Sequence, residues 1–337
     1  MVKKLLAAAA AAALIAALAA CGSNDDSTGS VSTATAGSGE KLTIGVTELF
    51  PIGFFADFER GLRAATKGKD VELVILNDQG DVGKENQNFQ ALITRRVDAI
   101  IATALNPTGS KAAFKSAEAA GIPVICYNSC LTESDSKAYA RQFITSDNVS
   151  LGGKTGKAVA DYVESELGGN GRALMLTCEQ FSPCQDRRKG IDKALRGSGV
   201  KLLQTQEAYQ VDKATPIARQ MLTAHSDANT IIAQNSDATT AAVTAVKTLG
   251  LSKKVAVFGV EIDPKIATLF GPSGAGVLRW TTAQDPYTQG IWSLESAVAV
   301  ASGKHVSPFL RYAPLPTFSI DDPAKAAQYA ADAKTQG

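Results

Sequence analysis

Cysteine is the most reactive residue type in this 337-residue chain, and four of its five cysteines lie in two close pairs. The spacings C-x3-C, at Cys126 and Cys130, and C-x5-C, at Cys178 and Cys184, suit either zinc ligands or disulfides. The two pairs fall in different halves of the strand–helix series described below, which disfavours one shared zinc site. We expect two local disulfides and no bound metal, while a Cys126–Cys178 link stays open as an alternative.

Three glutamates, Glu48, Glu179 and Glu261, lie near loops that follow expected strands. Two carboxylates placed on opposite sides of a glycosidic bond are the apparatus of a sugar hydrolase. The sequence alone therefore leaves a glycosidase open as one interpretation of this chain.

Other catalytic patterns find little support. Neither His225 nor His305 stands in a catalytic setting, and the chain has no nucleophile elbow and no His-x3-His pair. The run Leu151-Gly152-Gly153-Lys154-Thr155 is similar to the end of a P-loop, but that motif needs glycine where Asn148 stands and should follow a strand. The glycine pair more simply opens a helix, so we expect no nucleotide site and no cofactor.

The N-terminus has the layout of an export signal. A short basic start is followed by an apolar stretch over residues 5–18, which is too short for a comfortable membrane span. It ends in Leu18-Ala19-Ala20-Cys21, the pattern of bacterial lipoprotein signals. Residues 1–20 are therefore expected to be removed, and Cys21 is expected to carry lipid that anchors the protein at the outer face of the cytoplasmic membrane. Residues 21–40 are rich in Ser, Thr, Gly and Asp and are expected to be a flexible tether.

The charge balance excludes two classes of protein. The chain has 34 Lys and Arg against 33 Asp and Glu and is 45% hydrophobic. A disordered chain would be less hydrophobic and more highly charged. A nucleic-acid-binding protein would show a basic excess.

From residue 41 onward the apolar pattern alternates between strand and helix. Expected strands cover residues 42–46, 71–76, 99–102, 123–125, 173–176, 201–205, 230–233 and 255–259. Expected helices include one through Phe54, Phe58 and Leu62, one opened by Pro107, and one from Pro216 to His225. This alternation predicts doubly wound parallel sheets in two similar lobes, with any ligand beyond the carboxyl ends of the strands.

Short motifs at these strand ends resemble one family. They are Gly53-Phe54-Phe55, Val97 to Ile101 with Asn106-Pro107, Gly121-Ile122-Pro123-Val124, Ser146-Asp147-Asn148 with Gly152-Gly153, Ala233-Gln234-Asn235 and Ala283-Gln284-Asp285. In order and spacing the chain resembles the type I periplasmic sugar-binding proteins of ABC importers, and its motifs come closest to those of ribose-binding members. The resemblance runs from about residue 41 to residue 302.

The resemblance implies two α/β lobes joined by three hinge strands that close on a ligand. The expected N-terminal lobe covers residues 41–146 and 285–314, and the expected C-terminal lobe covers 147–284 and 315–337. It also implies a ligand-binding set: Phe54 and Phe55 as stacking rings, Tyr209 as another aromatic contact, Asn235 and Gln284 as polar contacts, and Glu261 and Asn128 at positions where the family has Asp. Glu48 and Phe50 lie in a first loop that is slightly longer here.

Three positions depart from the ribose-binding pattern. Ser129 and Gln185 stand where arginines are usual, and Val260 stands where Phe is usual. An arginine fork pairs well with neighbouring oxygens of a sugar. Without the two forks we expect a different ligand from ribose, such as a linear polyol, another pentose or a hexose.

The expected function is therefore capture of a sugar or polyol and its delivery to an ABC permease and its ATPase, by a protein that is not an enzyme and acts as a monomer. The alternative is a sensor that passes closure to a chemoreceptor or sensor kinase. A repressor that shares this lobe fold would carry a helix-turn-helix where the export signal stands.

Overall fold

The computed structural model describes residues 41–51 and 53–335 of the chain. The expected signal sequence, the lipid-bearing Cys21 and the tether lie outside the described residues. Within the described part, strands and helices alternate, and the strands form two six-stranded sheets. Each sheet with the helices packed on it is one lobe, so the predicted pair of α/β lobes is confirmed.

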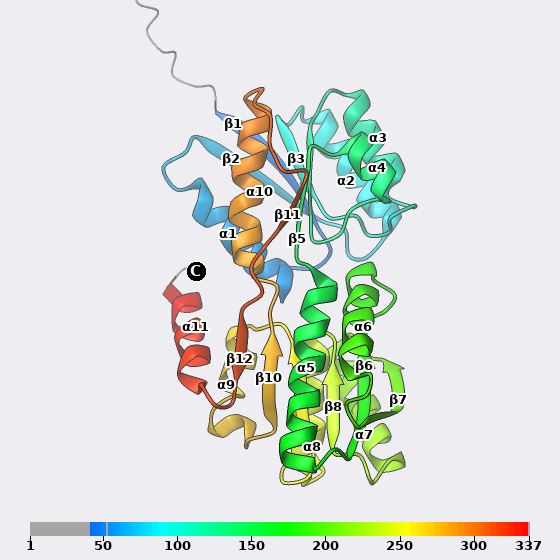
Figure 1. Cartoon of the computed structure of the whole chain (residues 1–337). Helices are drawn as coiled ribbons and strands as arrows, with labels where there is room; N and C mark the ends of the chain where they lie inside the picture. The colour runs from blue at the N-terminus through cyan, green and yellow to red at the C-terminus, as the bar shows by residue number, and fades with distance from the viewer. Residues whose placement is uncertain (1–40, 52, 336–337) are drawn as a thin grey trace, which may run out of the picture. The chain divides into compact units, whose positions relative to one another are not determined.

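The first lobe is built on sheet A (Figure 1). The strands of this sheet are β1 (Leu42–Glu48), β2 (Val71–Asn77), β3 (Ala99–Ala102), β4 (Val124–Tyr127), β5 (Gln142–Thr145) and β11 (Leu310–Tyr312). They lie in the order β11-β5-β4-β3-β1-β2, and each adjacent pair is parallel. The helices of this lobe are α1 (Phe54–Thr66), α2 (Val82–Thr94), α3 (Lys111–Ala119), α4 (Glu133–Tyr139) and α10 (Pro286–Ala301).

The second lobe repeats this plan on sheet B. Its strands are β6 (Gly171–Thr177), β7 (Val200–Glu207), β8 (Thr230–Ala233), β9 (Ala256–Val260), β10 (Leu278–Thr282) and β12 (Thr317–Ser319). They lie in the order β12-β10-β9-β8-β6-β7, and only the edge strand β12 runs antiparallel to its neighbour among these strands. The helices of this lobe are α5 (Asn148–Leu167), α6 (Ser182–Leu195), α7 (Val211–Ala224), α8 (Ser236–Thr248), α9 (Pro264–Thr268) and α11 (Pro323–Thr335), with a single 3-10 turn, η1, at Pro272–Gly274.

The central strands of each sheet are buried on both faces, because helices cover both. All four residues of β3 and all four of β8 are buried, as their continuous apolar sequences predict. Two hydrophobic clusters flank sheet A, and two flank sheet B. The central strand ends are therefore held rigidly, which is what a binding site placed beyond them requires.

In each lobe one pair of helices lies side by side, α1 with α10 and α5 with α6 (Figure 1), and glycines let their backbones approach closely. In the second lobe, a Cβ added to Gly152 of α5 would lie 2.0 Å from the backbone oxygen of Arg187, and one added to Gly190 of α6 would lie 2.0 Å from that of Val149. No side chain fits at such distances. Helix α5 begins at Asn148, where the N-cap Asp147 accepts a hydrogen bond from the Ser150 amide. Gly152 and Gly153 thus lie inside this helix and do not open it.

Two other helix starts differ from expectation. The Asn106 side chain accepts hydrogen bonds from the Thr108 and Gly109 amides, and this Asn turn delays α3 until Lys111, one turn after Pro107. Helix α7 begins at Val211 and contains Pro216. Its buried stripe includes Ala214, upstream of the proline, so packing favours the extra turn despite the missing amide donor.

The chain passes between the sheets three times, and a hydrogen-bonded junction joins the first two passages. These passages lie between β5 and α5, between β10 and α10, and between β11 and β12. The Ser146 hydroxyl donates to the Gln284 backbone oxygen at 3.0 Å, and the Gln289 side-chain amide donates to the same oxygen at 2.9 Å. The polypeptide that links the lobes is therefore ordered by buried polar contacts.

The C-terminal helix α11 contacts both lobes. It packs on α9 and β12 of the second lobe. Its Tyr329 hydroxyl donates to the Asp57 carboxylate of α1 at 2.8 Å, and Arg60 of α1 donates to the Ala333 backbone oxygen at 3.0 Å. Helix α11 is thus a further connection between the lobes.

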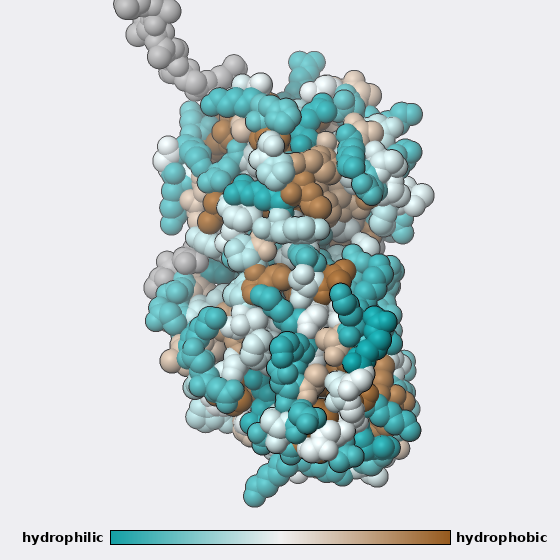
Figure 2. Space-filling model, viewed as in Figure 1, coloured by the Kyte–Doolittle hydropathy of each residue, from teal (hydrophilic) through white to brown (hydrophobic). Residues whose placement is uncertain are grey.

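Hydrophilic side chains cover most of the face drawn in Figure 2, with hydrophobic ones scattered among them. Among the described residues, the exposed large hydrophobic side chains are Val149, Leu310 and Tyr312. None of the described helices is both long and apolar enough to cross a bilayer.

Candidate functional site

A cavity of about 210 Å³ lies where strand ends of the two sheets face each other. Its walls come from the segments that follow β1, β3 and β4 in the first lobe and β6, β7, β8 and β9 in the second, with the second passage between the lobes as a further side. Nine of the eleven ligand-binding residues named from the sequence line it: Phe50, Phe54, Phe55, Asn128, Ser129, Tyr209, Asn235, Glu261 and Gln284. The other two, Glu48 and Gln185, lie outside the lining.

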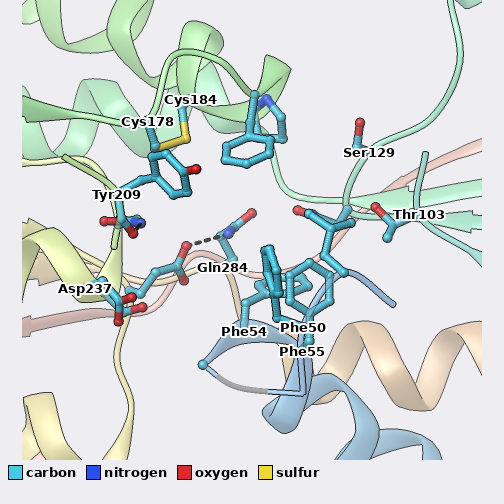
Figure 3. Close-up of a pocket in the computed structure, with 18 of the residues that line it drawn as sticks. Phe50, Phe54, Phe55, Thr103, Ser129, Cys178, Cys184, Tyr209, Asp237 and Gln284 are labelled. Atoms are coloured by element: carbon cyan, nitrogen blue, oxygen red, sulfur yellow. Dashed lines mark hydrogen bonds between the residues drawn. A yellow bond between two sulfur atoms is a disulfide. The ribbon is translucent and has the colours of Figure 1, made fainter. Parts of the chain in front are cut away.

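Phenylalanines form the wall of the cavity on the first lobe (Figure 3). The rings of Phe54 and Phe55 are 5.3 Å apart in an edge-to-face arrangement at the start of α1. Phe55 is nearly buried and packs edge-on against Tyr127, whereas Phe54 is half-buried at the cavity. Phe50, from the loop after β1, completes this wall.

The second lobe supplies an aromatic pair of its own. Tyr209 meets Phe181 edge-to-face with ring centroids 5.4 Å apart, and both line the cavity. Phe181 also packs against the hydrophobic cluster of the first lobe, so it touches both sides. Phe181 is a lining residue that the sequence motifs did not indicate. Its place between two cysteines of one loop was the available signal.

Both local disulfides are present, and each closes a loop at the cavity. Cys126–Cys130 spans the turn that carries Asn128 and Ser129, and Cys178–Cys184 spans the loop that leads into α6. The hydroxyl oxygens of Ser129 and Ser182 lie 3.4 Å apart, so the two disulfide-closed loops meet across the cavity. The alternatives of a zinc site and of a link between the pairs are therefore wrong, and the described residues contain no group of His, Cys, Asp and Glu that could hold a metal.

Asn235 both lines the cavity and caps α8. Its side-chain oxygen accepts from the Ala238 amide at 2.9 Å, and its side-chain nitrogen donates to the Tyr209 backbone oxygen at 2.9 Å. This second bond ties the loop that carries Tyr209 to the end of β8. Asn235 therefore orders the cavity wall as well as facing it.

Glu261 is the centre of a buried polar network. It follows β9 with a φ of 76°, a left-handed conformation that a glutamate rarely adopts. Its carboxylate accepts from the Gln284 side-chain amide at 2.5 Å (Figure 3) and lies 3.1 Å from the Arg187 guanidinium. Burial raises the pKa of Glu261, and the charge of Arg187 opposes that rise. The Gln284 side-chain oxygen is buried and has no partner among the described residues, so it is an acceptor available to a ligand.

One arginine, Arg187, lines the cavity, although positions 129 and 185 lack one. It lies on α6, two residues after Gln185, is 3% exposed and lines the cavity. Gln185 is exposed and donates to the Glu179 backbone oxygen at 2.9 Å. The position that the family resemblance assigned to an arginine therefore points outward, and the arginine two positions on points inward. A helical wheel of α6 places Arg187 with Cys184 and Ile191, which would have been the signal for its burial.

Glu48 is buried outside the cavity lining. It ends β1, is 3% exposed, and its Oε2 has no partner among the described residues. Burial raises its pKa to about 7, and burial also raises the pKa of its neighbour Asp78 to about 7. The Asp78 amide donates to the Glu48 backbone oxygen at 2.8 Å, so two acids adjoin at the ends of β1 and β2.

The comparisons with known proteins agree with this geometry. A family model described as periplasmic binding protein domain matches residues 46–305. This chain belongs to the periplasmic binding protein family. The curated relatives include the Escherichia coli ABC transporter periplasmic-binding protein YphF, 34% identical over 68% of this chain and 71% of its own length. They also include the ribose import binding protein RbsB of Escherichia coli, 30% identical over 75% of this chain and 82% of its own length.

Solved structures of periplasmic binding proteins show the same fold. One is an ABC transporter solute-binding protein from Mycobacterium smegmatis with bound glycerol, with a TM-score of 0.76 at 24% identity, covering 85% of this chain and 96% of that one. Another, from Bacillus halodurans with bound myo-inositol, has a TM-score of 0.76 at 21% identity, covering 87% of this chain and all of that one.

Membership of the periplasmic binding protein family settles two open alternatives. Proteins of this family bind solutes and do not catalyse a reaction, so the glycosidase interpretation of Glu48, Glu179 and Glu261 is wrong. The family also acts outside the cytoplasm, which makes this an exported protein.

Proposed function

We propose that this protein captures a monosaccharide or a small polyol between its lobes and delivers it to an ABC import permease. The observation that carries the proposal is the cavity itself. It combines aromatic rings from both lobes with buried amide and carboxylate oxygens. Rings suit the C–H faces of a sugar, and the oxygens suit its hydroxyls.

The size of the cavity favours a small ligand. At about 210 Å³ it is below the roughly 300 Å³ at which pockets for drug-sized molecules begin. Relatives whose names refer to ribose, and neighbours with bound D-allose, myo-inositol and glycerol, support a ligand of this size class.

Ribose itself is disfavoured. Ser129 and Gln185 replace the two arginines, and the arginine that is present, Arg187, is engaged by protein oxygens. A different pentose, a hexose or a linear polyol fits a site that offers acceptors and aromatic faces in place of cationic forks.

The proposed mechanism is closure on the ligand. The units that move are the N-terminal lobe, residues 41–146 and 285–314, and the C-terminal lobe, residues 147–284 and 315–337. A ligand that touches the phenylalanine wall and Glu261 together binds the closed form more tightly and shifts the population toward it. The closed monomer then docks on the permease, whose ATPase supplies the energy. Lipid on Cys21 holds the protein at the membrane.

A thermal-shift and calorimetry panel tests the proposal. It contains D-ribose, D-allose, D-galactose, L-arabinose, myo-inositol and glycerol. A ligand bound only to the folded state raises the melting temperature by mass action, and about 2.7 kcal/mol of stabilisation is expected at 100 times Kd. We expect at least one compound other than ribose to bind with micromolar or lower Kd. Tight binding of ribose alone would overturn the specificity, and the absence of binding across an extended sugar panel would overturn the function.

A further inference from the structure

Arg187 is the most completely enclosed cation at the cavity, and all three of its nitrogens are engaged. Its Nε donates to the Asn148 side-chain oxygen at 2.9 Å. Its Nη1 donates to the Gln234 backbone oxygen at 2.6 Å, and its Nη2 lies 3.1 Å from the Glu261 carboxylate. A guanidinium held in this way is fixed in position and has little freedom to turn toward a ligand.

The partners of Arg187 connect the cavity to the passages between the lobes. Asn148 is the first residue of α5, directly after the first passage, and its side chain donates to the Ser146 backbone oxygen at 3.2 Å. Glu261 is bonded to Gln284, which lies in the second passage. Arg187 therefore holds together Asn148, the end of β8 and the carboxylate that faces the ligand.

The direction of the Glu261 carboxylate is over-determined. Its backbone is in a left-handed conformation, its amide donates to the Thr282 backbone oxygen at 2.9 Å, and its carboxylate has donors from two different segments. A strained backbone persists only where the surroundings enforce it, and such places tend to be functional. Both side-chain donors meet the same carboxylate oxygen, Oε1, which therefore acts as an acceptor.

We propose that Arg187 is a positioning residue: it holds the Glu261 carboxylate ionised and aimed into the cavity, so that the site presents a fixed acceptor to ligand hydroxyls. The part of this inference that concerns ligand hydroxyls rests on the proposed function, whereas the part that concerns the charge of Glu261 does not. It also explains why the family's aspartate can be a glutamate here, because the longer side chain reaches a buried arginine. Anionic ligands find no free cationic fork at this place.

Arg187 is the charge that favours ionisation of Glu261, because the other charged groups named here are acidic. Arg187 faces it from α6, and Asp57 of α1 acts on it with the opposite sign. Asp237 of α8 lines the same cavity, and Asp263 lies two residues away. Removing Arg187 would leave Glu261 buried among acids, which favours its protonated form. Protonation would turn one of its oxygens into a donor and change what the site offers.

The direct test is a carboxyl titration of the ligand-free protein. Glutamate labelled with ¹³C is followed by NMR from pH 5.5 to 8, and the Glu261 signal is assigned by its loss in Glu261→Gln. We expect no titration of Glu261 in the wild type and a clear titration in Arg187→Met. Arg188→Met is the matched control, because Arg188 is the next residue and pairs with Glu179 and Asp192 at the surface; it should leave Glu261 unchanged. Titration of Glu261 in the wild type within this range would overturn the proposal, as would a Glu261 signal that stays at the chemical shift of the ionised carboxylate in folded Arg187→Met.

A second arm measures binding of D-allose and myo-inositol by calorimetry at pH 6, 7 and 8. Wild type and Arg188→Met should show Kd values that change less than twofold across this range. Arg187→Met should bind at least tenfold more weakly at pH 6 and regain affinity as the pH rises and Glu261 ionises. If Arg187→Met does not fold, the double variant Arg187→Met/Glu261→Gln, which removes both charges, should fold and bind with one weak, pH-independent Kd. A pH-dependent double variant would contradict the proposal. If no sugar binds the wild type, the proposed function fails, and the titration alone decides the role of Arg187.

Discussion

The two lobes bring a buried glutamate to the ends of their strands in different electrostatic settings. Glu48 ends β1 in the first lobe and lies beside Asp78, with no cation among its hydrogen-bond partners. Glu261 follows β9 in the second lobe and has Arg187 and Gln284 within 3.1 Å. The first glutamate has a pKa that burial raises to about 7 and lies outside the cavity lining, whereas the second lines the cavity and accepts from Gln284 beside Arg187. The same residue type thus has an acidic neighbour in one lobe and a cationic partner in the other.

The largest effect should come from removing the paired glutamate. Glu261→Ala leaves Arg187 buried without its counter-ion, and losing one partner of a buried pair costs about 3–5 kcal/mol of unfolding free energy. Urea unfolding at pH 7 measures it. Glu179→Ala is the control, because the partly exposed Glu179–Arg188 pair should cost under about 1 kcal/mol. Equal losses in the two variants would show that burial of the Glu261–Arg187 pair adds nothing to its contribution.

Glu48, which has no cationic hydrogen-bond partner, should make the free energy of unfolding depend on pH. Its pKa is raised from 4.5 to about 7, so the folded state holds a proton that the unfolded state releases. The resulting stability is complete below pH 4.5 and is lost as the pH rises through 7, by up to about 3 kcal/mol. Glu48→Gln, which cannot ionise, should therefore gain stability relative to wild type at pH 8 and not at pH 4.5.

Chemical denaturation at these two pH values makes that comparison. Asp78→Asn should act in the same direction, since its pKa is raised to a similar value. Glu166→Gln, at an exposed position of α5 in the other lobe, is a control that leaves both buried acids and their neighbours in place. A wild-type stability that stays level between pH 4.5 and 8, with no change in Glu48→Gln, would show that Glu48 is not protonated in the fold.

Removing each disulfide tests whether the two disulfide-closed loops at the cavity contribute equally to stability and to retention of the sugar. Closing so short a loop contributes about 2 kcal/mol in the chain-entropy account, so Cys126→Ser/Cys130→Ser and Cys178→Ser/Cys184→Ser should lose similar stability. Their effects on sugar release should differ. The second loop carries Phe181, which touches both lobes, so its opening should raise the dissociation rate more in stopped-flow measurements. A larger rate increase from the first loop would contradict this.

The smallest effect should come from the contact between the two disulfide-closed loops. Ser182→Ala removes one hydroxyl of the 3.4 Å Ser129–Ser182 pair, which should cost less than about 1 kcal/mol and raise the sugar dissociation rate no more than a few-fold. Ser134→Ala, on a helix away from the cavity, is the control. A rate change above tenfold would mean that this contact governs release.

The sequence was sufficient for the alternation of strands and helices and for most of the cavity lining. The buried strands β3 and β8 were placed at their observed bounds, because a four-residue apolar run between turn residues has few alternatives. Positions that follow strand ends predicted the cavity lining, as they do for Phe54, Asn128, Asn235 and Gln284.

Other features depended on tertiary contacts that no local pattern encodes. Gln185 and Arg187 are two positions apart on one helix, and the close packing of α5 on α6 decides which one faces inward. Glu48 directly precedes the loop that carries Phe50 in the sequence, yet its side chain is buried outside the cavity lining. Strand β11 is three residues long and exists only because it pairs with β5, some 165 residues earlier in the chain.

The late return of the chain sets the order in which this protein can be completed. The first lobe receives α10 and its edge strand β11 only after every strand of the second lobe but one has been made. The last helix then ties itself to α1 through Tyr329 and Arg60. A nascent chain that lacks its final thirty residues therefore has neither a complete first sheet nor the contacts of α11 with α1. Long-range closure of this kind slows folding, so this chain should become compact later than a chain of the same length with local pairings.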